Sequence, residues 1–330
     1  MDFRPSASLE NLRRRAQIIG EIRSYFDRRD FLEVQTPILS RDTVIDQYID
    51  PISLPIRFQG KQETFYMQTS PEYAMKRLLA AGMERIYQIT PVFRSGDRGK
   101  THNIEFTMLE WYRVGDSYTE GMDLLADLVC AIGSFSRCDR LSFGEAVERS
   151  TGLNPHRATA KDYQRYAEEK GIVCPESFTD PQSSASNGDW LDLVFSEVVQ
   201  PDLGKENPII LYDYPGTDAQ LAQSRKEKFS DGEEYQVAER FELFIHGLEL
   251  ANGYHELLDP EELRRRNVRT LEQRKKAGKD PLPAESRLLQ AMDHGLPPCC
   301  GCALGVERLL MILLNSDSID QVLPFPIDIA

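Results

Sequence analysis

The chain has 330 residues, 41% of them hydrophobic and 28% charged, which is the composition of a folded globular protein and excludes a disordered or fibrous one. Its 53 acidic and 39 basic residues give a net charge of −14, so nucleic acid is a poor default partner. No apolar run approaches the length of about 20 residues that crosses a bilayer, and the first residues lack the apolar core of a secretory signal. We therefore expect a cytoplasmic protein with no membrane partner.

The first eighty residues predict two helices separated by strands. Ser8 is a typical N-cap, and the apolar residues after it form one stripe, namely Leu9, Leu12, Ala16, Ile19, Ile22 and Phe26. After a strand-like run at 64–69, Ser70 is predicted to cap another helix, with Pro71 at its first position and Gly82 at its end. The first helix is amphipathic, so we expect one of its faces to be buried.

Two pairs of strand-like segments predict antiparallel hairpins. Residues 85–94 and 105–113 are β-rich runs on either side of a turn-rich loop, and residues 240–254 contain a second pair that turns near Gly247. Strands joined by such local connections, with helices before and after them, indicate an α+β fold built on an antiparallel sheet flanked by helices.

The remaining segments predict helices and one long loop. Helical patterns cover 119–135 and 260–278, whereas 176–189 is rich in Ser, Asp and Pro and predicts an exposed loop. We expect a single domain over residues 1–330, with an insertion or loop region around residues 150–205.

Three basic runs occur in segments with helical patterns: Arg13–Arg15, Arg264–Arg266 and Arg274–Lys276. Such runs on helices are usually solvated faces, and we predict this for all three.

The six cysteines are expected to be thiols. Cys299 and Cys302 form a single CxxC without a second pair, and His294 is the only histidine close to them in sequence. Packing of small side chains is therefore a better interpretation of this cluster than a metal or redox site.

The common signatures of phosphate loops, dinucleotide folds, zinc proteases and serine hydrolases are absent from the sequence. Instead, polar residues interrupt apolar strand and helix segments at Arg94, Glu110, Glu242, Glu249, Asn252, Glu256 and Arg308. Arginine forks suit a polyphosphate, paired carboxylates suit Mg²⁺, and the remaining carboxylates suit a cationic substrate. From spacing alone, internal salt bridges of a stable sheet are the simpler alternative.

Several segments resemble class II aminoacyl-tRNA synthetases of the lysine type. VFRSGDRGKTHNIEFTMLEWY (92–112) resembles motif 2, ALGVERLLMIL (303–313) resembles motif 3, and FLEVQTPIL (31–39) resembles motif 1 with its characteristic proline. TSPEYAMKRLL (69–79) and GLELANGYHEL (247–257) resemble the amino-acid pocket segments of the same subfamily. The motifs stand in the family's order and cover the chain from about residue 9 to its end.

Within this class the chain resembles the elongation factor P–lysine ligase family. The helix before motif 1 begins near residue 8, so we expect no anticodon-binding domain, and Ala303 stands where lysyl-tRNA synthetases usually carry glycine. The resemblance implies activation of lysine or (R)-β-lysine with ATP and Mg²⁺, followed by transfer to a lysine side chain of elongation factor P. It also implies a homodimer with the motif 1 helix and strand at its interface, and it makes tRNA an unlikely partner.

The resemblance further implies roles for individual residues. The nucleotide would be bound by Arg94, Ser95, Gly96, Asp97, Asn103, Glu249, Leu250, Gly305 and Arg308, with Arg94 and Arg308 as the catalytic arginines and Glu242 and Glu249 as the Mg²⁺ ligands. The amino acid would be bound by Ser70, Pro71, Glu72, Glu110, Tyr112, Asn252, Glu256 and Ala303, with Glu256 as the main partner of its side-chain amine. Gly96 departs from the family, which has Glu there, so that contact is expected to pass to Asp97 or to the backbone.

Two alternatives remain open at this point. A stand-alone lysyl-adenylate-forming enzyme would charge tRNA or another small acceptor, and a catalytically inactive binding module would bind the same ligands without turnover. In addition, the sequence does not decide between α-lysine and β-lysine, and the apolar stripe of the first helix could pack only within its own chain.

Overall fold

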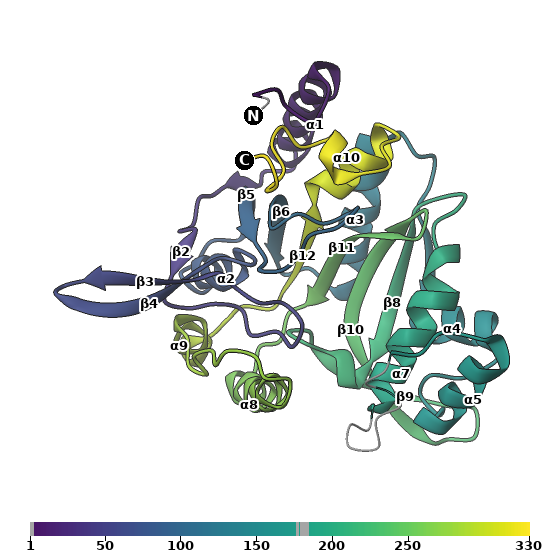
Figure 1. Cartoon of the computed structure of the whole chain (residues 1–330). Coiled ribbons are helices and arrows are strands. Elements are labelled where there is room, and N and C mark those ends of the chain that lie inside the picture. Colours follow the sequence, from purple (N-terminus) through teal and green to yellow (C-terminus); the bar gives the residue numbers. More distant parts are fainter. Residues whose placement is uncertain (1–2, 176–177, 179–184) are drawn as a thin grey trace. The chain divides into compact units, whose positions relative to one another are not determined.

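A computed structural model describes residues 3–175, 178 and 185–330 (Figure 1). The chain divides into two compact units. The first consists of Met1–Leu128 and His255–Ala330, and the second of Val129–Tyr254. The second unit is thus inserted into the sequence of the first, and the single-domain organisation stays a prediction.

The first unit contains a mainly antiparallel sheet with helices from both ends of the chain. Its elements are α1 (Leu9–Asp27), β1 (Leu32–Glu33), β2 (Leu39–Ser40), β3 (Ser53–Phe58), β4 (Lys61–Met67), α2 (Glu72–Ala80), β5 (Arg85–Phe93), β6 (Glu105–Val114), α8 (Pro260–Lys276), α9 (Arg287–His294), β12 (Cys299–Gly305), α10 (Val306–Leu313) and the 3₁₀ turn η4 (Ile319–Gln321). The strand order is β1-β5-β6-β12, and only β1 runs parallel to its neighbour. Strands β2, β4 and β3 form a separate sheet, of which β3 and β4 extend as a two-stranded arm (Figure 1).

The second unit begins within α3 (Tyr118–Gly133) and holds the rest of the elements. They are β7 (Asp139–Ser142), α4 (Phe143–Thr151), α5 (Ala160–Lys170), α7 (Asn187–Val194), the π-helical η1 (Phe195–Val199), the 3₁₀ turns η2 (Gln200–Asp202) and η3 (Gly216–Asp218), β8 (Ile209–Pro215), β9 (Ser224–Lys228), β10 (Glu234–Ile245) and β11 (Leu248–His255). Strands β11, β10, β8 and β7 lie in that order, and β9 pairs with β10.

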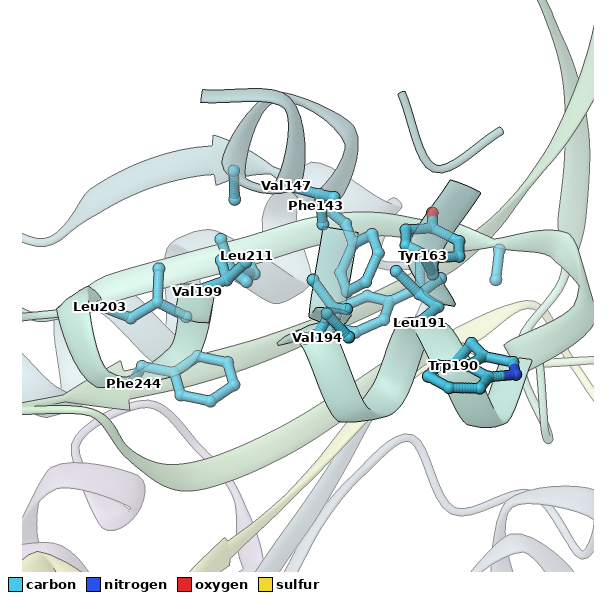
Figure 2. Close-up of a cluster of buried hydrophobic side chains, with 14 of the residues drawn as sticks. Phe143, Val147, Tyr163, Trp190, Leu191, Val194, Val199, Leu203, Leu211 and Phe244 are labelled. Carbon is cyan, nitrogen blue, oxygen red and sulfur yellow. The ribbon is translucent and has the colours of Figure 1, made fainter. Parts of the chain in front are cut away.

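The core of the second unit forms where α4, α5 and α7 pack on β8 and β10 (Figure 2). Phe143, Tyr163, Leu191 and Val194 come from the helices and Leu211 from β8, and each is at most 3% exposed. Apolar burial of this kind is the main stabilising term in folding. Ala238 and Phe244 of β10 belong to this core, so it packs against the strand that carries Glu242 and pairs with β11.

The predicted hairpins are confirmed. β5 and β6 pair antiparallel, with Phe93 opposite Glu105 at the end next to the loop. β10 and β11 pair through a tight turn at His246 and Gly247, whose φ angles are 51° and 73°. Glycine adopts positive φ without steric cost, which explains its position in this turn.

Two helix predictions are wrong in part. α1 buries Ile18, Ile22, Tyr25 and Phe26, whereas Leu9 is 62% exposed, so the buried stripe is rotated from the predicted one. α2 begins at Glu72 with Pro71 as its N-cap, although the Ser70 hydroxyl accepts a hydrogen bond from the Glu72 amide.

The loop predicted at 176–189 ends before residue 187 in the structure, so its predicted C-terminal boundary is also wrong. Residues 176–177 and 179–184 lie outside the described residues, and residues 187–189 already form the first turn of α7. Ser186 and Asp189 make a reciprocal capping box there, which is why polar residues that predict a loop begin a helix.

Two of the basic residues that we predicted to be solvated are bound to the protein. Arg274 is 1% exposed, and its guanidinium donates to the backbone oxygens of Asp46 and Ile49 and pairs with Asp50 at 2.8 Å. Arg15 forms an ion pair with buried Glu307 at 2.9 Å. Helical periodicity identifies a charged run, but the neighbours in space decide whether it meets solvent.

Glu307 connects three elements of the first unit. Its carboxylate pairs with Arg15 of α1 and accepts a 2.8 Å hydrogen bond from the Thr107 amide of β6, while Glu307 itself belongs to α10. Arg15 also donates to the Thr107 hydroxyl at 2.8 Å. A carboxylate that is 1% exposed needs such partners, because an unpaired buried charge is strongly destabilising.

None of the helices in the described part of the chain is both long and apolar enough to cross a membrane.

We predict that Glu307→Gln lowers the free energy of unfolding by about 3 kcal/mol, because it leaves the Arg15 guanidinium without its counter-charge. Urea denaturation measures this change. Arg14→Met is the matched control on the same helix: Arg14 and Glu21 form a pair that is about half exposed, so the loss is expected to stay below about 1 kcal/mol. Equal effects of the two substitutions would contradict a special role for Glu307.

Candidate functional site

Three carboxylates are buried together in the first unit. Glu72 lies in the first turn of α2, Glu110 lies in β6, and Glu256 follows β11. They are 7%, 1% and 1% exposed, respectively. Burial of so many like charges is costly unless they are paired, protonated or bound to a ligand, so this cluster is a candidate binding site.

Two hydroxyl groups hold the carboxylate of Glu110. Tyr112 donates to one of its oxygens at 2.6 Å, and Ser70 donates to the other at 2.7 Å. Burial and the nearby charge of Glu72 raise the pKa of Glu110 to about 7, although the two hydroxyls and Lys76 oppose the shift. Glu110 therefore loses its proton near neutral pH.

Lys76 lies between the other two carboxylates. One turn after Glu72 on α2, it is 2% exposed, and its ammonium is 2.5 Å from a Glu72 oxygen and also pairs with Glu256. Burial alone lowers the pKa of Lys76, but Glu256 and Glu72 together raise it above its ordinary value, so Lys76 is charged. Burial raises the pKa of Glu256, and Lys76 opposes that shift.

Strand β12 forms one wall of this site. In its register with β6, Gly301 lies opposite Tyr112 and Ala303 lies opposite Glu110. A Cβ atom at Gly301 would be 2.2 Å from the Tyr112 ring and 2.6 Å from a Glu256 oxygen. Glycine at this position is therefore what allows the tyrosine and the carboxylate to approach the strand.

The cysteines of β12 are structural. Cys299, Cys300 and Cys302 are free thiols and are at most 3% exposed, and burial raises the pKa of each one. Neutral, buried thiols are poor nucleophiles and poor metal ligands. No group of three or more potential metal ligands occurs among residues 3–175, 178 and 185–330.

The two predicted catalytic arginines lie elsewhere in the first unit. Arg94 follows β5 and lies over the Phe106 ring at 5.0 Å, and Arg308 lies in the first turn of α10. An Arg308 nitrogen is 2.6 Å from His102 Nε2. Because arginine can only donate, His102 accepts with an unprotonated Nε2; burial and then Arg308 lower its pKa accordingly.

The loop after Arg94 is fixed by the C-terminal segment. Arg98 pairs with Asp320 at 3.0 Å and with Asp328 at 2.5 Å. Asn103 is 3% exposed; it donates to the Glu105 carbonyl oxygen at 2.7 Å and accepts from the Ile327 amide at 3.1 Å. The fold thus uses one N–H and one lone pair of this amide, which fixes its orientation and leaves its second N–H as a possible donor to a nucleotide.

The remaining predicted nucleotide residues of the first unit are turn and strand-end positions. Ser95 donates its backbone amide to the Asp50 carbonyl, Asp97 acts electrostatically on His102, and Gly305 is the N-cap of α10. Gly96 has φ +82°, and nothing lies within 4 Å of a Cβ built on it. The left-handed turn explains why glycine stands at a position where the resembled family has glutamate.

The predicted metal ligands belong to the hairpin of the second unit. Glu242 of β10 is 6% exposed; it accepts a 2.6 Å hydrogen bond from the Tyr214 hydroxyl and pairs with Arg240. Glu249 and Leu250 lie on β11, and Asn252 lies opposite Glu242 in the register. Two carboxylates from neighbouring strands suit Mg²⁺, which takes one or two protein carboxylates and fills its shell with phosphate oxygens and water. The two carboxylates fit such an ion. Arg240 would have to release one of the Glu242 carboxylate oxygens so that the ion can bind it.

Lys76, Gly301 and His102 carry no functional prediction from the sequence. The sequence does contain a signal for Lys76. It stands four residues after Glu72, so the two side chains share one face of the predicted helix, where apolar residues would be usual. No pattern in the sequence shows that Gly301 is next to Tyr112 and Glu256, since these three residues are brought together only by the sheet.

The model of the family described as tRNA synthetases class II (D, K and N) matches residues 1–329. The chain belongs to this family. It is 39% identical over 328 residues to elongation factor P–(R)-β-lysine ligase of Haemophilus influenzae (strain PittGG), covering 99% of this chain and 98% of that protein. It is 40% identical over 329 residues to the ligase of the same name from Pasteurella multocida (strain Pm70), with 99% and 98% covered.

A third relative with this name, from Haemophilus ducreyi, is 38% identical over 330 residues, which cover 99% of this chain and 97% of the relative. These matches confirm the resemblance found in the motifs, and with it the α+β fold of a class II synthetase domain and the assignment to a family of ligases.

We predict that Gly301→Ala destabilises the first unit by about 1–3 kcal/mol, because the added methyl group overlaps the Tyr112 ring and Glu256. Thermal unfolding measures the effect as a lower Tm. Gly20→Ala is the control: Gly20 lies in α1 with nothing within 4 Å, and alanine favours the helix, so its Tm is expected to stay equal or rise. A Gly301→Ala protein as stable as the wild type would contradict the close packing described here.

Proposed function

We propose that this protein activates (R)-β-lysine or lysine with ATP as an aminoacyl-adenylate and transfers the acyl group to a lysine side chain of elongation factor P. The observation that supports the substrate class is the cluster of Glu72, Glu110 and Glu256, which leaves a net negative pocket even with Lys76 present. A neutral amino acid would leave buried carboxylates unpaired, whereas a diammonium ligand neutralises them. The names of the relatives support the acceptor.

The reaction has two balanced steps. The carboxylate oxygen of the amino acid attacks the α-phosphorus of ATP, the bond to the β-phosphate oxygen breaks, and pyrophosphate leaves. The acceptor amine then attacks the acyl carbon of the adenylate, the bond to the AMP oxygen breaks, and the amine loses a proton as the amide forms. Neither step needs a covalent enzyme intermediate.

Arginine side chains would stabilise the charge that develops in the first step. We propose that Arg94 binds the α-phosphate and that Arg308 binds the γ-phosphate and the adenine, since guanidinium forks match phosphate oxygens and are always charged. Mg²⁺ held by Glu242 and Glu249 would neutralise phosphate charge when bound. Positioning and charge stabilisation of this kind supply most of the catalysis in phosphate chemistry.

Because elongation factor P is a translation factor, we also propose that the enzyme works in the cytoplasm. Charging of tRNA is the alternative that the sequence leaves open, and the acceptor that becomes labelled distinguishes it.

The test is a side-by-side acylation with Mg-ATP and radiolabelled α-lysine or (R)-β-lysine, offered either total tRNA or unmodified elongation factor P. We expect label on elongation factor P only. Label on tRNA only would overturn the proposed acceptor, and absence of pyrophosphate exchange with either amino acid would overturn the activity itself. Arg94→Ala is expected to lose about 10²–10³-fold in pyrophosphate exchange, because it removes one charge-stabilising donor.

We further propose that the protein is a homodimer through α1, β1 and β2. Leu9 on α1 and Leu32 on β1 are 62% and 55% exposed, and Leu39 on β2 is also exposed, so the motif 1 region and the helix before it carry apolar side chains that a second chain could cover. We expect light scattering to give the mass of two chains and Leu9→Glu with Leu32→Glu to give one chain. Val268→Glu, at an exposed position of α8, is the control that should stay dimeric. A monomeric wild-type protein would contradict the proposal.

A further inference from the structure

Lys76 has no role in the reaction as proposed, yet it lies at the centre of the acidic cluster. Its ammonium contacts Glu72 of its own helix and Glu256 from a distant part of the chain, and it lies 5.9 Å from the centre of the Tyr112 ring. Among the described residues, Glu110 forms no ion pair. One internal cation therefore serves two of the three carboxylates.

The charges of the cluster match a diammonium ligand only when Lys76 is counted. When all three carboxylates are ionised, they and the Lys76 ammonium sum to a charge of −2, which two ligand ammonium groups neutralise. Without Lys76 the cluster would carry a third negative charge that the same ligand cannot neutralise. A buried carboxylate without a counter-charge takes up a proton instead, because desolvation favours its neutral form.

The position of Lys76 also sets the distance between Glu72 and Glu256. Both carboxylates contact the same ammonium, so their nearest oxygens are at most two short hydrogen-bond lengths apart. Two like charges would otherwise repel each other. In β-lysine the inner amine is one carbon nearer to the terminal amine than in α-lysine, so carboxylates held close together favour the β isomer.

We propose that Lys76 is a positioning and specificity-determining residue, an internal counter-ion that fixes both the charge of the pocket and the separation of the carboxylates that receive the substrate amines. This inference rests on the proposed function, since it concerns the binding of the diamino acid in the same site. Lys76 itself touches no reacting atom, so its effect should appear in KM and in discrimination more than in kcat.

The test compares wild type, Lys76→Met, Lys76→Arg and Arg77→Met in pyrophosphate exchange with α-lysine and (R)-β-lysine from pH 6 to 9. Arg77 is the matched control, an exposed cation next to Lys76 on the same helix. For Lys76→Met we expect KM for both isomers to rise at least tenfold, kcat to change less, and the ratio of kcat/KM for the β over the α isomer to fall at least tenfold.

The pH profile separates the role in charge from a role in packing alone. The titratable groups that interact with Lys76 are the carboxylates of Glu72, Glu110 and Glu256, the phenols of Tyr73 and Tyr112, and the thiol of Cys299. In wild type, KM should fall as pH rises through about 7 to 8, because Glu110, with a pKa of about 7, and Glu256, with a pKa of about 8, then lose their protons and can pair with ligand ammonium groups. Loss of the Lys76 cation raises carboxyl pKa values, so the midpoint of Lys76→Met should move upward by about one pH unit or more.

Lys76→Arg keeps the charge and changes the length and shape of the side chain. We expect its pH midpoint to stay at the wild-type value, while the ratio of kcat/KM for the β over the α isomer changes at least threefold. If Lys76→Met does not fold, Lys76→Arg alone tests the inference. Unchanged isomer ratios in both variants, or an unchanged pH midpoint in folded Lys76→Met, would overturn the inference. A wild-type protein that activates neither diamine would instead overturn the proposed function, so the two failures are distinguishable.

Discussion

The burial of charge around Lys76 is the constraint on which the rest of the candidate site depends. Glu72, Glu110 and Glu256 are almost inaccessible to solvent, and one lysine partly compensates them. Such an arrangement is unfavourable in an empty protein, because removing ionised groups from water costs more than one cation returns. The surrounding structure must therefore hold the carboxylates in place.

The sheet of the first unit provides this support. β6 contributes Glu110 and Tyr112, and β12 approaches closely enough to contact them because Gly301 has no side chain. Glu307 then connects the helix after β12 to β6 and to α1 through two short polar contacts. The segments that resemble motifs 2 and 3 are thus joined to the helix before motif 1 by one buried carboxylate.

The loop between β5 and β6 differs from the acidic cluster in how its polar side chains are paired. Its arginine and asparagine side chains already have protein partners in this structure, notably Asp320 and Asp328 for Arg98 and the Ile327 backbone for Asn103. In the acidic cluster three carboxylates share one ammonium, whereas the loop is held by contacts with the C-terminal segment. Pre-formed sites lose less conformational entropy on binding, which favours affinity.

The sequence by itself determined the class of fold, the two hairpins and the identity of most polar candidates. Period-two and period-3.6 patterns report which face of an element is apolar, and the order of the motif segments is family-specific. The tertiary structure alone decided which charges meet: that Arg274 and Arg15 are bound by the protein, that α1 buries Ile18 and not Leu9, and that Lys76 lies between Glu72 and Glu256. Local patterns cannot contain this information, because an ion pair or a close approach at Gly301 depends on residues that are distant in the chain and become neighbours only when the sheet forms.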